Sequence, residues 1–198
     1  MNSLLILLIF AVVVGGYLWT VYNRFVSTKA RIKASIQEIA NQLKRQANLI
    51  PNLITSVKGY MKHESKIFKA LTEARKMVTK LNAASSPKTL IEASSQLQSA
   101  LQPIRVVLES TPELKAAGPT SKLMDELRDT ADKVMYSRRT LIDLTADYNI
   151  MRQTFPSNLV ANLFSFKAQP GLSSQSAEAE KEMTEVSKGE VKTPKVDL

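Results

Sequence analysis

The sequence predicts an all-α protein: an N-terminal transmembrane helix continues into an elongated, antiparallel up-and-down helical bundle, followed by a disordered C-terminal tail. Three observations predict this fold. Residues 4–22 contain no charged side chain. After them, apolar residues recur at alternating spacings of three and four, which places them on one face of a helix. The 198-residue chain also has only 6 glycines and 6% aromatic residues, a composition that favours helices over sheets.

Residues 4–22 are long enough to cross a membrane. As a helix they extend roughly 28 Å, close to the thickness of the hydrocarbon core of a bilayer. Tyr17, Trp19 and Tyr22 cluster at the C-terminal end of the segment, where aromatic rings favour the headgroup level. The alternative is a cleaved signal peptide, but residues 1–3 carry no basic side chain and no small-x-small cleavage site follows the apolar run. We therefore expect an uncleaved transmembrane helix.

The basic residues predict the orientation and the lipid contacts. Four of them follow the apolar segment closely and are expected to touch lipid headgroups: Arg24, Lys29, Arg31 and Lys33. The positive-inside rule then makes residues 1–3 a short extracytoplasmic end and places residues 23–198 in the cytoplasm. This topology corresponds to a single-pass protein of the inner (cytoplasmic) cell membrane.

The bundle is expected to occupy residues 23–166. Its predicted helices are 22–82, 87–110, 120–155 and 157–166. Within the first helix, we interpret Pro51 as a kink, because the apolar stripe keeps its register across it. Ser86 can cap the second helix, and Pro156 ends the third. The first helix is too long for the second to cover, so either the third helix or another copy of the chain must cover the rest of its stripe.

Residues 167–198 are rich in Gln, Ser, Glu, Lys, Gly and Pro and are predicted to be disordered.

The excess positive charge belongs to the first helical stretch. Residues 23–82 contain 13 Lys and Arg against 3 Asp and Glu, whereas residues 83–156 contain 9 of each. Lys44 and Arg45 form a candidate interaction surface, which is either a solvated face or a contact for an acidic protein partner. Nucleic acid is disfavoured as a partner because the chain is tethered to a membrane and its basic residues lack interleaved aromatic residues.

A second candidate interaction surface lies in the predicted last helix. Its apolar members are Leu159, Val160, Leu163, Phe164 and Phe166. They can close the end of the bundle as a lid. They can also contact a partner helix or the membrane surface, because two phenylalanines on so short a helix are costly to leave in water. The sequence leaves both interpretations open.

The chain lacks the side chains that most catalytic and metal sites require. It has no cysteine and a single histidine, His63. A histidine-based zinc site or a catalytic triad would therefore have almost no suitable side chains to draw on. We expect no enzymatic activity, no catalytic residues, no metal site and no cofactor. An enzyme that uses Asp125, Asp129 and Asp132, which share one helix face, is the alternative. Such a face more often complements a basic neighbour, here the first helix.

Several sequence blocks carry a resemblance to a known family. They are YNRFV at 22–26, QLKRQANLIPNLITSVKGYMKHE at 42–64, LTEAR at 71–75, DYN at 147–149, FPSNLVANLFSFK at 155–167 and PKVDL at 194–198. In this order they resemble the LemA family of bacterial membrane proteins, over nearly the whole chain. The resemblance implies one membrane span and an antiparallel helical cytoplasmic domain, with no established activity. It also implies a membrane metalloprotease as a conceivable partner.

The sequence thus predicts a non-enzymatic, membrane-anchored scaffold or interaction protein. Its coiled-coil-like basic surface would serve self-assembly, as a homo-oligomer, or the binding of another membrane protein. The alternative is a membrane-tethered enzyme or an adaptor of one, such as an accessory to a membrane protease.

Overall fold

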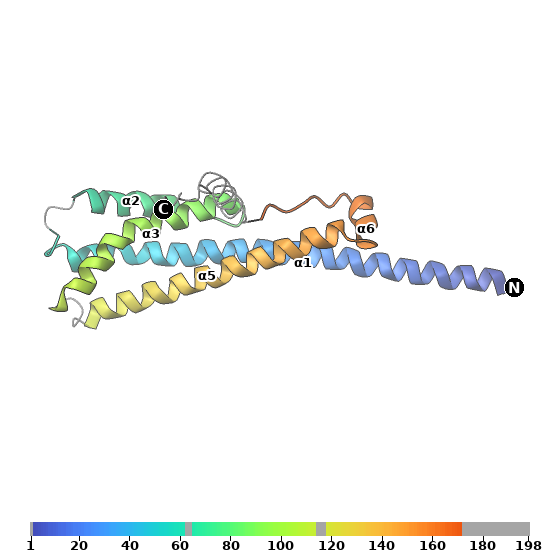
Figure 1. Ribbon diagram of the computed structural model, residues 1–198, viewed down its shortest axis with the longest axis horizontal. Coiled ribbons are helices and arrows are strands. Elements are labelled where there is room, and N and C mark those ends of the chain that lie inside the picture. The colour runs from blue at the N-terminus through green and yellow to red at the C-terminus, as the bar shows by residue number, and fades with distance from the viewer. Residues whose placement is uncertain (1, 62–64, 114–117, 172–198) are drawn as a thin grey trace, which may run out of the picture.

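The computed structural model describes residues 2–61, 65–113 and 118–171, and the elements in these ranges are all helices joined by turns. The helices are α1 (Asn2–Val57), α2 (Ser65–Thr79), α3 (Pro87–Ser110), α5 (Gly118–Gln153) and α6 (Ser157–Leu163) (Figure 1). The predicted all-α class and elongated antiparallel bundle are confirmed.

Helix α1 is the central element and has two distinct parts. It contains 56 residues, which corresponds to a length of roughly 84 Å. Its first five turns project from the bundle with their apolar side chains exposed; Leu4, for example, is 75% exposed and Phe10 68%. From Val21 onward one face is buried. The apolar segment and the bundle therefore share one continuous helix.

The other helices pack around the second part of α1, which contacts α2, α3, α5 and α6. Helix α5 runs beside α1 over the length of the bundle, whereas α2 and α3 flank only the end far from the N-terminus (Figure 1). The bundle thus narrows from four helices to the α1–α5 pair as it approaches the apolar segment. The apolar stripe of α1 is buried inside the chain at Ile39, Leu43, Ile50 and Leu53. The sequence left open whether the third helix or a second copy of the chain covers the rest of this stripe. In the structure, helices of the same chain cover it, chiefly α5.

The expected single helix over residues 22–82 is wrong. Helix α1 ends at Val57, and the backbone turns over Lys58–Tyr60, where the Tyr60 N–H donates to the Val57 carbonyl (2.9 Å). Helix α2 then packs back against α1 and α3, which buries Leu71, Ala74 and Val78. An in-line helix would leave these side chains in water, so burial favours the hairpin. Pro51 lies inside α1 and does not end it.

The later helices begin close to the predicted positions. Helix α3 starts at Pro87, and the Thr89 N–H donates to Ser86 Oγ (3.1 Å), which confirms the predicted cap. Helix α5 begins two residues earlier than predicted and ends two residues earlier, and α6 stops three residues short of Phe166.

The expectation of a disordered tail from residue 167 needs a correction at its start. Asn149 on α5 holds the backbone of Gln169 through two hydrogen bonds, one donated by Asn149 Nδ2 to the Gln169 carbonyl (2.9 Å) and one by the Gln169 N–H to Asn149 Oδ1 (3.0 Å). The segment after α6 is therefore docked on the bundle at least to Gln169. The rest of the expectation, for residues 172–198, lies outside the described residues.

Candidate membrane-proximal surface

An aromatic cluster joins three segments at the end of the bundle that adjoins the apolar segment. Phe25 on α1 is fully buried. Its ring meets Tyr148 of α5 edge-on, with the centroids 5.4 Å apart, and stacks on Phe166 at 4.7 Å. Tyr22, one turn earlier, contacts Phe164 at 4.8 Å and Phe166 at 5.6 Å. These contacts fix α6 and the residues after it to the point where α1 emerges from its apolar segment (Figure 1).

Tyr148 is the polar member of this cluster. Its side chain is fully buried, and its hydroxyl has no hydrogen-bond partner among the described residues. Burial raises the pKa of Tyr148, while nearby Gln169 and the positive charge of Arg152 oppose that rise. The hydroxyl therefore stays protonated at neutral pH, and the nearby Gln169 side chain offsets only part of the cost of burying it.

Helix α6 has an inner and an outer apolar face. Val160 and Ala161 are buried against the bundle, and Phe166 is half-buried. Leu159 and Leu163 are 57% and 67% exposed, and Phe164 remains 49% exposed beside Tyr22. The inner face accounts for the lid that the sequence suggested, but it does not account for the outer face. The buried residues of α6 thus fit the interpretation as a lid, and its exposed residues fit the interpretation as a contact with a partner helix or a membrane surface.

The four juxtamembrane basic residues lie on two flanks of α1. Arg24 and Arg31, seven residues apart, share one flank and line a shallow groove with Asp147 of α5. Lys29 and Lys33 lie about 140–200° around the helix from them. All four are exposed. Relative to Tyr22, Arg24 stands about 3 Å and Lys33 about 16 Å further along the axis of α1.

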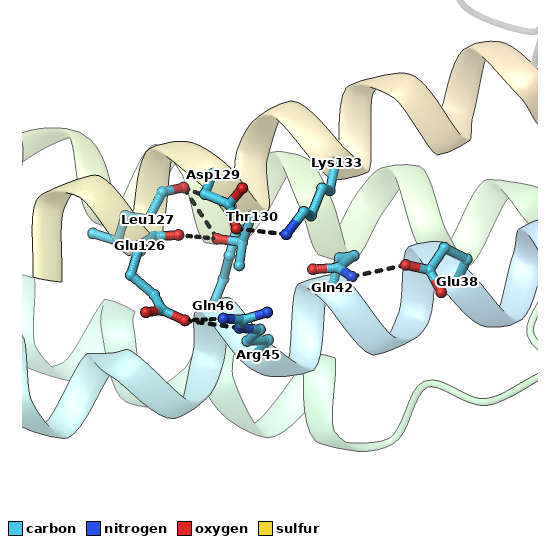
Figure 2. Close-up of polar contacts among 9 residues, drawn as sticks. All are labelled: Glu38, Gln42, Arg45, Gln46, Glu126, Leu127, Asp129, Thr130 and Lys133. Atoms are coloured by element: carbon cyan, nitrogen blue, oxygen red, sulfur yellow. Dashed lines mark hydrogen bonds and ion pairs between the residues drawn. The ribbon is translucent and has the colours of Figure 1, made fainter. Parts of the chain in front are cut away.

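Lys44 and Arg45 lie much further from the apolar segment. Arg45 pairs with Glu126 of α5, and its Nε donates to Glu126 Oε1 at 2.8 Å (Figure 2). Beside it, the buried Gln46 donates to the Leu127 carbonyl at 3.4 Å. Arg45 thus fastens α1 to α5, while Lys44 is half-buried. The structure does not bring either residue close to α6.

The carboxylates of the enzyme alternative are distributed along exposed parts of α5. Asp129 accepts a hydrogen bond from Lys133 one turn later (2.7 Å; Figure 2). Asp125 and Asp132 line separate shallow hollows, each beside Arg128. No group of three or more His, Asp or Glu side chains with metal-binding geometry occurs within residues 2–61, 65–113 and 118–171. His63 lies outside these ranges.

The sequence interpretation missed the cluster of Phe25, Tyr148 and Phe166. Each of these residues lies in one of the blocks that carry the family resemblance, but their meeting depends on the register between α1 and α5. The one usable signal was that YNRFV, DYN and FPSNLVANLFSFK all carry aromatic residues at predicted helix ends.

No curated protein matches the chain at a significant level. The sequence model of the LemA family, in contrast, matches residues 35–187, which is most of the chain. That span includes α1 from Ser35 onward and the whole of α2, α3, α5 and α6. The chain therefore belongs to the LemA family.

Proposed function

We propose that this chain is a non-enzymatic, membrane-anchored interaction protein whose helical bundle stands on the cytoplasmic face of the membrane and offers a basic outer surface to a partner protein or to further copies of itself. The observation that carries the proposal is the continuity of α1. One helix is apolar and largely exposed over its first part and is packed into a bundle over its second.

The anchor is supported by the hydropathy and the exposure of α1. An 18-residue window of this helix has a mean hydropathy of 2.5, and only 6% of that window is buried. Such a row of exposed aliphatic side chains is unfavourable in water and favourable in lipid. The basic residues that follow support a cytoplasmic bundle.

The interaction surface is best placed on α2. Because the chain turns back after Val57, the basic residues of α2 come to lie on the outside of the bundle. They are all exposed, together with the lysine that directly follows the helix: Lys66, Lys69, Arg75 and Lys76 within α2, and Lys80 after it. Within Ser65–Thr79, Glu73 is the single acidic residue, and it forms an ion pair with Lys76 (2.7 Å). We refer to these five residues as the basic face of α2. The apolar stripe of α1 is already used inside the chain, so association through the basic face should be governed by charge and weaken with salt.

The non-enzymatic part of the proposal is supported by the side chains available. The carboxylates at Asp125, Asp129 and Asp132 are exposed and stand beside basic neighbours, as in a solvated face. Replacing all three with asparagine should leave the function of the chain intact in a complementation assay. Loss of function with the fold preserved would instead favour the enzyme alternative.

The central test uses full-length protein in nanodiscs, studied by light scattering and by crosslinking mass spectrometry against native membranes. We expect either a defined oligomer or a captured partner, with crosslinks concentrated on α2. The variant K66E/K69E/R75E should abolish the contact. The variant K88E/K122E/R139E changes the net charge equally at exposed sites elsewhere and should retain it. A monomer without crosslinked partners, or equal losses in both variants, would contradict the proposal.

A further inference from the structure

We infer that α6 is a second membrane contact, an interfacial foot that inserts its outer apolar face among the lipid headgroups on the side from which the bundle part of α1 emerges. The inference rests on the proposed membrane anchoring of α1, but not on the basic face of α2 or on any partner. Its occupant is an anionic lipid surface.

The depth of α6 follows from the anchor. Leu4 and Tyr22 are about 27 Å apart along a straight helix, close to the roughly 30 Å of a hydrocarbon core. When this segment spans the membrane, Tyr22 lies at the boundary between hydrocarbon and headgroups. Phe164 lies 4.8 Å from Tyr22, ring to ring, so it must occupy the same level. Helix α6 cannot stand clear of the membrane unless this contact breaks.

The outer face of α6 has the composition of an interfacial contact. It consists of Leu159 and Leu163, one turn apart, flanked by Phe164 and by Phe155 at the corner between α5 and α6. Val160 and Ala161 pack the short helix against the bundle, so the outer residues are not needed for that packing. Phe155, one of them, is 74% exposed. Aromatic and leucine side chains at this level lie where amphipathic surface helices insert.

The charge of this end favours lipid over a protein groove. Residues 19–37 contain Arg24, Lys29, Arg31 and Lys33 and no acidic residue. Residues 148–171, which include the end of α5 and all of α6, contain Arg152 and Lys167 and again no acidic residue. Asp147 on α5, which lines a groove with Arg24 and Arg31, partly offsets this charge, but basic side chains remain in excess around the apolar face and match an anionic headgroup layer. A soluble partner would have to enter that same layer to reach it.

The depth of α6 can be measured in the full-length protein, because the chain has no cysteine to remove. Single substitutions Leu163→Cys, Ile142→Cys and Val13→Cys would carry a fluorescent bimane label in nanodiscs of phosphatidylethanolamine and phosphatidylglycerol. Quenching would be compared between nitroxide-labelled lipids and a water-soluble quencher. Ile142 is the matched control: it is an exposed aliphatic residue on α5, about 20 Å along the helix from the Phe155 corner. Val13 reports on the anchor itself.

We expect lipid quenching at Leu163 to be several-fold stronger than at Ile142. Quenching at Leu163 should be strongest with nitroxides near the headgroups. Quenching at Val13 should be strongest with nitroxides deep in the acyl chains. Quenching at Val13 with none at Leu163 would overturn the inference and leave the anchor standing. Lack of lipid quenching at Val13 would instead overturn the anchoring on which the inference rests. Equal lipid quenching at Ile142 and Leu163 would mean that the whole bundle lies on the membrane. Protection of Leu163 from both quenchers would mean that protein covers it. Either result would refute a specific foot.

Discussion

Replacing Phe25 with alanine should weaken the attachment of α6 to the bundle. Phe25 is fully buried and joins α1 to Tyr148 on α5 and to Phe166 after α6. Truncation of a buried phenylalanine to alanine costs about 3–5 kcal/mol. Within that total, each lost aromatic pair accounts for roughly 0.5–1.5 kcal/mol. The contact with Phe166 is the part that holds the segment after α6, so local opening of this segment should become easier by about 1–2 kcal/mol.

Hydrogen exchange measured by mass spectrometry on the full-length protein in detergent would show this weakening. An easing of about 1.4 kcal/mol corresponds to roughly tenfold faster exchange of the α6 amides. Urea unfolding of the same sample would report the global loss. The control Phe25→Leu keeps most of the apolar volume and should cost only about 1–2 kcal/mol. If Phe25→Ala lowers global stability but leaves exchange in α6 unchanged, the aromatic cluster does not hold α6, and the reasoning fails.

Three further predictions concern the rest of the bundle. Tyr148→Phe removes a buried hydroxyl without a described partner and should be neutral or stabilising by up to about 1 kcal/mol in urea unfolding; a clear loss would reveal a hydrogen bond to that hydroxyl. The Arg45 and Glu126 side chains are 50% and 37% exposed, so a double-mutant cycle to alanine should give a coupling of only about 0.2–1 kcal/mol, and a value well above this would mean a desolvated pair. Spin labels at Asn41→Cys and Arg75→Cys should lie roughly 20 Å apart in the hairpin, whereas a continuous helix would separate them by about 51 Å in a pulsed dipolar measurement.

The hairpin shows where periodicity stops being informative. The apolar stripe continues from Val57 through Tyr60, Ile67 and Leu71 at helical spacing, so it fits an in-line helix as well as two packed helices. Local chemistry at the turn offers only Gly59. The choice between the two arrangements depends on whether α1 and α3 can cover α2, which is a property of the tertiary structure. By contrast, the start of α3 was predictable because Ser86 and Pro87 specify it locally.

The candidate surface was predictable in part for a similar reason. The juxtamembrane basic residues and the apolar residues of α6 can each be recognised from a short stretch of sequence. Two contacts instead depend on the alignment of the long helices α1 and α5. Arg45 pairs with Glu126, 81 positions away, and Phe25 meets Tyr148. Many registers of α1 against α5 bury the same apolar stripe, and long-range packing selects among them.

Two membrane contacts would also divide the basic residues into two groups that lie at different distances from the membrane surface. An anchor at α1 and a foot at α6 fix both the tilt and the rotation of the bundle, because α1 continues between membrane and bundle as one helix. Val57 then stands roughly 50 Å from the boundary at Tyr22, and α2 returns over only about 22 Å. With α1 upright, the basic face of α2 lies some 30–50 Å above the membrane, several times the Debye length of about 8 Å at physiological salt. On the proposed anchoring, Arg24 and Lys29 can act on lipid, whereas the charges of α2 are too distant to do so, which favours the proposed contact of α2 with an acidic protein surface.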